Sequence, residues 1–202
     1  EFGVKAGLRD ENGKGVLAGL TNISDIRAFQ YVNGVKKPAD GQLLYRGYDV
    51  KDLIRGSSGS RFAFEEAAYL LLFGELPTQE KLEEFCRVLG ECRTMPTNFT
   101  RDVIMKAPSH DIMNSMARSV LTLASYDPMA NDLDISNVLR QSIQLTGIFP
   151  MLAVYGYHAY NHYEKDGSMY IHRPDPQLST AENFLRMLLS LIHISEPTRH
   201  SL

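Results

Sequence analysis

Cysteine is scarce in this chain of 202 residues, which contains only Cys86 and Cys92. The two positions are six residues apart in one predicted helix, so their side chains would project to different faces. We therefore expect neither a disulfide nor a metal pair, and we interpret both as small buried hydrophobic residues. This cysteine usage fits a reducing compartment, and the predicted location is cytoplasmic.

Long apolar runs and a strong net charge are also missing. No apolar run approaches the roughly 18 residues that span a bilayer. The composition is that of an ordinary globular protein, with 44% hydrophobic residues, 22% charged residues and a net charge of -3. It offers no electrostatic footprint for nucleic acid and no polybasic patch for a membrane surface, so we expect neither as a partner.

Several common catalytic motifs are absent as well. The sequence has no glycine-rich phosphate loop ending in Lys-Ser/Thr, no dinucleotide fingerprint and no Gly-x-Ser-x-Gly elbow. His158 and His162 stand four apart on one face of a predicted helix, a spacing that could clamp a metal, but no glutamate lies between them and no third ligand is identifiable. A structural pair is the favoured interpretation.

Three further positions could meet a ligand. His110, at a helix start, could titrate near neutral pH, but it has no acidic or nucleophilic partner nearby in sequence. The loop His172-Arg173-Pro174-Asp175-Pro176 could meet an anion, and a solvated connection is the favoured alternative. Arg46 is best explained as a buried guanidinium that bonds turn carbonyls. Most of the eight methionines are interpreted as core filler.

Residues 1–48 predict a turn-rich arm. Turn signals stand at Asn12-Gly13, Asn33-Gly34 and Asp40-Gly41, and the apolar residues around the last two suggest a small hairpin. Asp49 is placed to cap a short helix over residues 50–55.

The stretch Phe64–Thr78 is the most distinctive in the chain. Its first half is apolar nearly all round, so we expect this helix to be covered on most sides. Gly74 can close the helix in the left-handed conformation, Pro77 blocks continuation, and Thr78 starts the next helix.

The remainder, to residue 189, predicts helices with mostly short connections. Asp111 and Asp134 are expected caps, Pro150 is placed in the first turn of a separate helix over 148–163, and Ser179 with Glu182 has the spacing of a capping box. We predict an all-α fold of about seven helices, with helices over residues 78–93, 99–106, 111–125, 134–145, 148–163 and 181–189.

Several blocks of sequence, in matching order and spacing, resemble the citrate synthase family over roughly residues 3–188. They are residues 7–21, Leu44-Tyr45-Arg46-Gly47-Tyr48-Asp49, Phe64–Thr78, and Pro174-Asp175 ahead of residues 182–185. The first three blocks are specific in combination. The resemblance implies that residues 49–189 are the N-terminal part of the family's large helical domain.

The resemblance also implies an activity. Family members join acetyl-CoA, a substrate and not a cofactor, to oxaloacetate as homodimers, with an aspartate base acting together with a histidine that hydrogen-bonds the thioester oxygen. Those catalytic motifs belong to the family's C-terminal half and are absent here, and nothing is carried over to His193. We therefore assign no catalytic, cofactor-binding or metal-binding residue, and we expect the chain alone to be inactive.

Two alternatives stay open. The family also contains 2-methylcitrate synthases, which use propionyl-CoA. The chain could instead be a non-catalytic helical fragment that pairs through residues 111–125 and 134–145, which resemble the family's dimer-forming region. Residues 190–202 match nothing expected from the family, and we predict that they are a non-native tail. A truncated helical domain should also expose apolar faces and dissolve poorly or self-associate.

Overall fold

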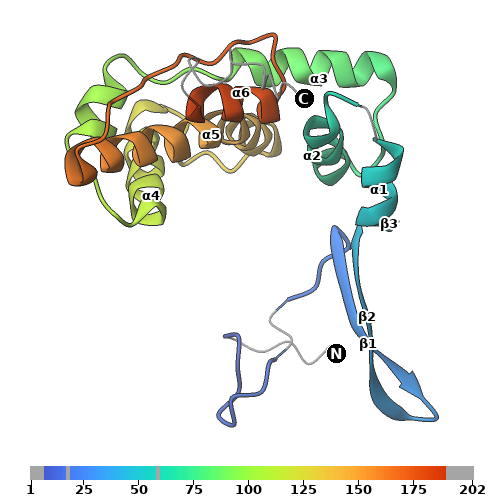
Figure 1. The fold of residues 1–202 in the computed structure, drawn as a ribbon. Coiled ribbons are helices and arrows are strands. Elements are labelled where there is room, and N and C mark those ends of the chain that lie inside the picture. The colour runs from blue at the N-terminus through green and yellow to red at the C-terminus, as the bar shows by residue number, and fades with distance from the viewer. Residues whose placement is uncertain (1–6, 17–18, 58–59, 190–202) are drawn as a thin grey trace, which may run out of the picture. The chain divides into compact units, whose positions relative to one another are not determined.

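The computed structural model describes residues 7–16, 19–57 and 60–189. The chain divides into two compact units, Glu1–Thr78 and Gln79–Leu202, and each is described by itself. The first contains a small sheet and two helices, and the second is helical (Figure 1). The predicted tail at 190–202 lies outside the described residues.

The sheet of the first unit has three antiparallel strands in the order β1-β2-β3: β1 Ser24–Val32, β2 Val35–Tyr45 and β3 Tyr48–Asp49. Val32 pairs with Val35 across a two-residue turn in which Asn33 and Gly34 have φ of 52° and 75°. Only Asn, Asp and Gly adopt such angles readily, so the Asn-Gly pair fixes the hairpin. The predicted hairpin is confirmed, and the purely all-α class is wrong because this sheet is present.

The turn expected at Asp40-Gly41 is also wrong, because both residues lie inside β2. The pairing register moves from Arg27 opposite Gln42 to Phe29 opposite Pro38. Three residues of β2 therefore face a single residue of β1. A bulge of this kind absorbs a turn-favouring dipeptide without ending the strand.

Two helices follow the sheet. The first, α1 (Val50–Gly56), is capped by Asp49, whose side chain accepts from the Lys51 amide at 2.9 Å, as predicted. The second, α2 (Ala63–Phe73), ends at Gly74, which has φ 84° and donates its amide to the Leu70 carbonyl at 2.8 Å. The predicted helix stop is confirmed.

The expectation that α2 would be covered on most sides holds in part, because residues 67–72 are buried or half-buried while both ends of the helix are exposed. Leu70 is fully buried and Tyr69 is 9% exposed, but Phe64 and Phe73 are 46% and 44% exposed. The helix therefore carries more apolar surface than the described residues cover, which is the condition in which such a helix gains from a further partner.

The second unit is built around one long helix. Its elements are α3 (Gln79–Glu91), the π-helical turn η1 (Thr100–Met105), α4 (Ile112–Leu123), the 3₁₀ turn η2 (Ala124–Tyr126), α5 (Ile135–Lys165) and α6 (Thr180–Leu188). Helix α5 supplies most of the buried core, and Phe99, Ile104 and Met187 join it from neighbouring segments. The α5 core residues are Ile148, Met151, Leu152, Val154, Tyr155 and Ala159.

Helix α5 corrects the expectation of two helices over 134–145 and 148–163. It runs unbroken for 31 residues with Pro150 inside it. Proline removes one main-chain hydrogen bond, but the buried side chains that follow it hold the helix against α4 and α6. Gly147 assists, because a β-carbon there would lie 3.1 Å from Cys92 Cβ and 3.2 Å from the Leu89 carbonyl oxygen. Gly147 thus lets α5 approach the end of α3 closely.

The remaining helix signals hold. Asp111 caps α4 by accepting from the Asn114 amide at 3.0 Å. Ser179 and Glu182 form the full capping box at the start of α6. Among the described residues, no helix combines the length and apolarity that crossing a membrane requires.

Candidate functional site

The two histidines of α5 do not converge on a common point. His158 is buried and donates from Nε2 to the Met187 carbonyl at 2.9 Å, whereas His162 donates from Nδ1 to the Gly167 carbonyl at 2.8 Å. Within the described ranges no group of three potential ligands is placed to hold a metal. In this arrangement His158 ties α5 to the last turn of α6, and His162 closes the C-terminal end of α5.

Arg46 connects the Arg-Gly-Tyr turn to the C-terminal end of α2. Its Nη2 donates to the Leu71 carbonyl at 3.0 Å, and its guanidinium lies about 4 Å from the β-carbon that Gly74 lacks. A cation is favourable there because the last carbonyls of a helix are unpaired and partly negative. The predicted hydrogen bond from the Arg46 guanidinium to a main-chain carbonyl is present, but the acceptor is the Leu71 carbonyl of helix α2 and not a carbonyl of the turn.

His110 and the loop between α5 and α6, the other positions that could meet a ligand, each have separate surroundings. His110 is exposed just before the α4 cap. In the loop, the Tyr155 hydroxyl donates to the His172 carbonyl at 2.7 Å, while Arg173 is exposed. The His172 ring stacks on Tyr170 with their planes 4° apart.

A cluster of buried and half-buried residues holds the end of this loop against α3. We call Gly90, Arg93, Asn183 and Arg186 the loop clamp. Arg93 is 7% exposed, and its guanidinium donates to the Leu178 carbonyl at 2.6 Å and to Thr180 Oγ1 at 3.2 Å. At Gly90, an added β-carbon would meet the Pro176 carbonyl oxygen at 2.6 Å, so only glycine lets the loop approach.

The rest of the loop clamp acts on Asp175. The Asn183 side chain accepts from the Asp175 amide at 2.7 Å and donates to its carbonyl at 2.8 Å, and Arg186 pairs with its carboxylate at 3.1 Å. Sequence reasoning missed Gly90 and Arg93. The available signal was a glycine inside an amphipathic helix, which often marks close packing.

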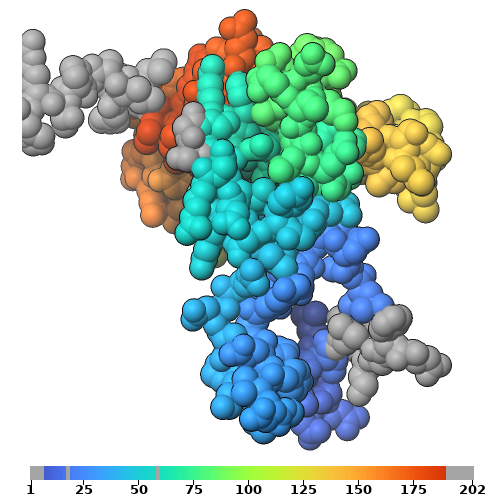
Figure 2. Space-filling view, turned by 90° about the vertical axis from the view of Figure 1, so that its right-hand side faces the viewer, coloured from blue at the N-terminus to red at the C-terminus, as the bar shows by residue number. Residues whose placement is uncertain are grey.

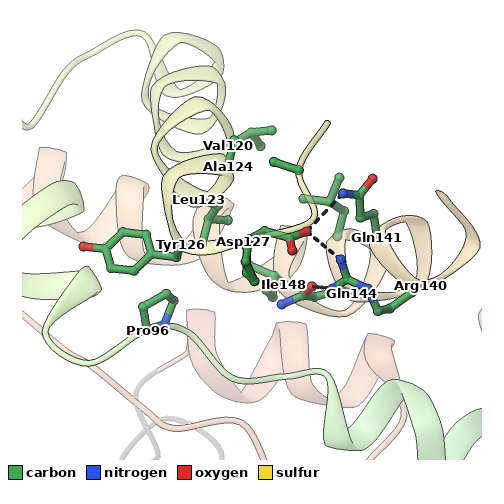
Figure 3. A pocket seen from close by; sticks show the side chains of 13 residues that line it. Pro96, Val120, Leu123, Ala124, Tyr126, Asp127, Arg140, Gln141, Gln144 and Ile148 are labelled. Atoms are coloured by element: carbon green, nitrogen blue, oxygen red, sulfur yellow. Dashed lines mark hydrogen bonds and ion pairs between the residues drawn. The ribbon is translucent and has the colours of Figure 1, made fainter. Parts of the chain in front are cut away.

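A cavity of about 350 Å³ in the second unit lies between α4, η2 and α5 (Figure 3). Leu123, Ala124 and Ile148 form part of its apolar wall, together with Pro96. The polar edge is made by Asp127, Arg140, Gln141 and Gln144.

The polar groups at this edge are bonded to one another. Arg140 Nη2 lies 2.7 Å from Asp127 Oδ2, and Gln141 Nε2 donates to the same oxygen at 3.0 Å (Figure 3). These contacts, with the Arg140 hydrogen bond foremost, hold the pKa of Asp127 below its usual range. The cavity has the size of a small-molecule site but presents a paired carboxylate, which is suited to shaping the interhelical turn and not to proton transfer.

An exposed apolar stripe runs along α4 and the start of α5. Met113 and Leu121 are each 74% exposed, and Ala117 between them is exposed at the same helical spacing. Leu133 and Ile135 are each 85% exposed. The segment that joins these helices, yellow in Figure 2, stands out from the rest of the second unit. The interpretation of Met113 as core filler is therefore wrong. We call Met113, Ala117, Leu121, Leu133 and Ile135 the α4–α5 stripe.

The described chain is mostly helical, with a small antiparallel sheet in the first unit and the long helix α5 in the second. The family model described as "Citrate synthase, C-terminal domain" matches residues 8–201. The chain belongs to the citrate synthase family.

Two relatives illustrate the range of this match. The chain is 34% identical over 149 residues to a citrate synthase of Corynebacterium glutamicum, covering 73% of this chain and 32% of that protein. It is 28% identical over 174 residues to a 2-methylcitrate synthase 1 of the same organism, covering 86% of this chain and 40% of that protein. The chain thus spans well under half the length of these relatives.

Solved structures agree with the fold. The citrate synthase of Pyrobaculum aerophilum superposes with a TM-score of 0.68 at 25% identity, over 92% of this chain and 46% of that one. The citrate synthase of Thermoplasma acidophilum, solved with carboxymethyl coenzyme A and oxaloacetate, superposes with a TM-score of 0.67 at 23% identity, over 85% and 39%. The second likeness concerns the fold alone.

Proposed function

We propose that this chain is part of an acyltransferase that condenses acetyl-CoA with oxaloacetate to give citrate and CoA, working as a homodimer. The observation that carries the proposal is the family match over residues 8–201, supported by relatives named as citrate synthases. Propionyl-CoA is the alternative acyl donor, because a relative named as a 2-methylcitrate synthase covers 86% of this chain.

The chain alone is expected to be inactive. The described residues supply a helical scaffold in which His158, His162, Arg46 and Asp127 are each engaged with a neighbouring group. The resemblance assigns the aspartate base and the histidines to sequence beyond this chain. The contribution of this chain is then to position that sequence, and the loop clamp does so by fixing the start of α6.

A thiol-release assay tests the reaction. The longer protein that contains this chain is incubated with oxaloacetate and either acetyl-CoA or propionyl-CoA, and CoA release is followed. We expect turnover with acetyl-CoA above turnover with propionyl-CoA, and none from the 202-residue chain. Preference for propionyl-CoA would overturn the assignment of the donor, and turnover by the chain alone would show that it carries the catalytic groups itself.

A second candidate function, helical self-association without catalysis, is favoured by the α4–α5 stripe. Four of its side chains are 74–85% exposed, and a group of exposed large apolar side chains is typical of an interaction site. In this candidate the second copy covers α4 and the start of α5.

Sedimentation tests this candidate with Leu121→Arg. We expect the unsubstituted chain to be dimeric and Leu121→Arg to associate much more weakly, because a charge in an apolar interface is desolvated without a partner. Leu8→Arg, at a residue that is 81% exposed in the first unit, is the matched control and should leave the dimer intact. A monodisperse, cooperatively melting monomer would argue against this surface.

A further inference from the structure

A second surface of the chain has the form of a self-pairing site: the outer edge of β1. Strand order places β1 beside β2 only, and in the described part of the sheet no strand occupies its other side. All nine of its residues are exposed, and Ile26 and Tyr31 are 75% and 68% exposed. A long exposed edge without proline or glycine is a ready template for another strand.

The open edge can be assigned to particular residues. The Arg46 amide donates to the Ile23 carbonyl at 2.8 Å, so Ile23 directs its main-chain groups toward β2. Main-chain groups alternate along an antiparallel strand, so Asp25 and Arg27 also face β2, whereas Ser24 and Ile26 face away from it. Before the bulge that follows Arg27, the free donors and acceptors of this edge are therefore those of Ser24 and Ile26.

Charge then selects one register for a second copy of β1. A two-fold axis at Ile26 pairs Ile26 with Ile26 of the second copy through main-chain hydrogen bonds and places each Asp25 opposite the other copy's Arg27. Axes at the neighbouring positions would put Asp25 against Asp25 or Arg27 against Arg27. Opposite charges in facing positions stabilise a sheet and like charges destabilise it. Within each chain Arg27 Nε already pairs with Asp25 Oδ2 at 2.8 Å, and the two side chains stay 61% and 55% exposed, so in this register the two ion pairs would meet with opposite charges facing each other.

We propose that β1 pairs antiparallel with β1 of a second copy of this chain about a two-fold axis at Ile26, which joins the two hairpins into one continuous sheet. The contact is isologous, since the same residues act on both copies. It is separate from the α4–α5 stripe and does not depend on the proposed acyl transfer. The ladder is short, so the association is weak on its own and concentration-dependent.

Disulfide trapping with Ile26→Cys tests the register. Facing residues in a hydrogen-bonded antiparallel pair have Cα atoms about 5.5 Å apart, a distance that a disulfide spans. Val32→Cys is the matched control, because two copies of residue 32 would lie about 40 Å apart in this register. We expect mild oxidation to link Ile26→Cys into a dimer and to leave Val32→Cys and the unsubstituted chain at the same low background. Equal linking of the two variants would overturn the proposal.

A charge-swap mixture tests the selection by charge, in the Ile26→Cys background. Asp25→Arg alone and Arg27→Asp alone each place like charges opposite one another, so linking should fall about tenfold. Mixing the two variants restores both opposite-charge pairs, so linked heterodimer should return to the level of the parent. Circular dichroism of each variant excludes unfolding as the cause of the loss. Absence of recovery in the mixture would overturn the proposal.

Discussion

In the second unit most of the buried core belongs to α5, and Leu152 is 1% exposed, whereas in the first unit every residue of β1 is exposed. The two regions are therefore held by different forces. Burial of apolar surface holds α5, and it accommodates both a proline and a glycine in mid-helix. Local geometry holds the hairpin, through the Asn33-Gly34 turn and the main-chain ladder. An isolated two-stranded ribbon is only marginally stable in water, so the hairpin is the region that gains most from a partner.

Leu152→Ala should give the largest loss of stability, because it removes a side chain from the core around α5. Removing a fully buried leucine leaves a cavity, so we expect a loss of about 3 kcal/mol in the free energy of unfolding. Urea denaturation followed by helical circular dichroism measures it. Leu121→Ala, at a residue that is 74% exposed, is the control and should change stability by less than about 0.5 kcal/mol in the monomer. Similar losses at both positions would show that α5 is not the stabilising core.

Gly90→Ala tests the close approach that fixes the loop between α5 and α6. The new β-carbon would lie 2.6 Å from the Pro176 carbonyl oxygen, so the loop must shift, and we expect a loss of about 2 kcal/mol in the free energy of unfolding. Gly56→Ala is the matched control in α1, where nothing lies within 4 Å. There alanine should be neutral or stabilising by up to about 1 kcal/mol, because it favours helix. If Gly90→Ala leaves the free energy of unfolding unchanged, the close approach at Gly90 does not fix the loop.

The difference between locally determined structure and structure held by distant residues also explains what could be predicted from the sequence. Local signals were sufficient for caps and turns: Asp49, Asp111 and the Ser179–Glu182 box act on amides within three residues, and Asn33-Gly34 forms the hairpin turn. Each is decided by a few neighbouring residues, so no knowledge of the fold is required.

Predictions that depended on distant partners were less successful. Pro150 was expected near a helix start, because the sequence does not show that packing of α5 outweighs one lost hydrogen bond. The Asp40-Gly41 turn failed because pairing with β1 absorbed it as a bulge. Arg93 was missed because its acceptors, the Asp175 and Leu178 carbonyls, lie more than 80 residues away in sequence.

Gly34→Ala tests whether the turn conformation of Asn33-Gly34 stabilises the hairpin independently of the helical core. The residue has φ 75° and open space around it, so the cost is backbone strain alone, about 1 kcal/mol. Because the hairpin is exposed, we expect this cost as faster amide hydrogen exchange across the Val32–Val35 pair, with the unfolding of α5 unchanged. Gly41→Ala, which also has open space and no positive φ, should leave exchange at that turn unchanged. A loss of helical stability in Gly34→Ala would mean that hairpin and core are coupled.

Asp127→Asn gives the smallest expected effect and tests whether a half-buried ion pair contributes to the stability of the second unit. Arg140 and Gln141 lower the pKa of Asp127 in the folded chain, so the charged carboxylate stabilises the fold above its unfolded pKa, near 3.9. That contribution is lost as pH falls below about 4 and through the lowered pKa. We therefore expect Asp127→Asn to be slightly less stable than the parent at pH 7 and equal to it near pH 2, with the difference reduced by salt. Melting temperatures across this pH range measure the difference. A gap between parent and variant that persists near pH 2 would show that the Asp127 contacts act by shape and not by charge, which would make this edge resemble the packed core instead of the locally held hairpin.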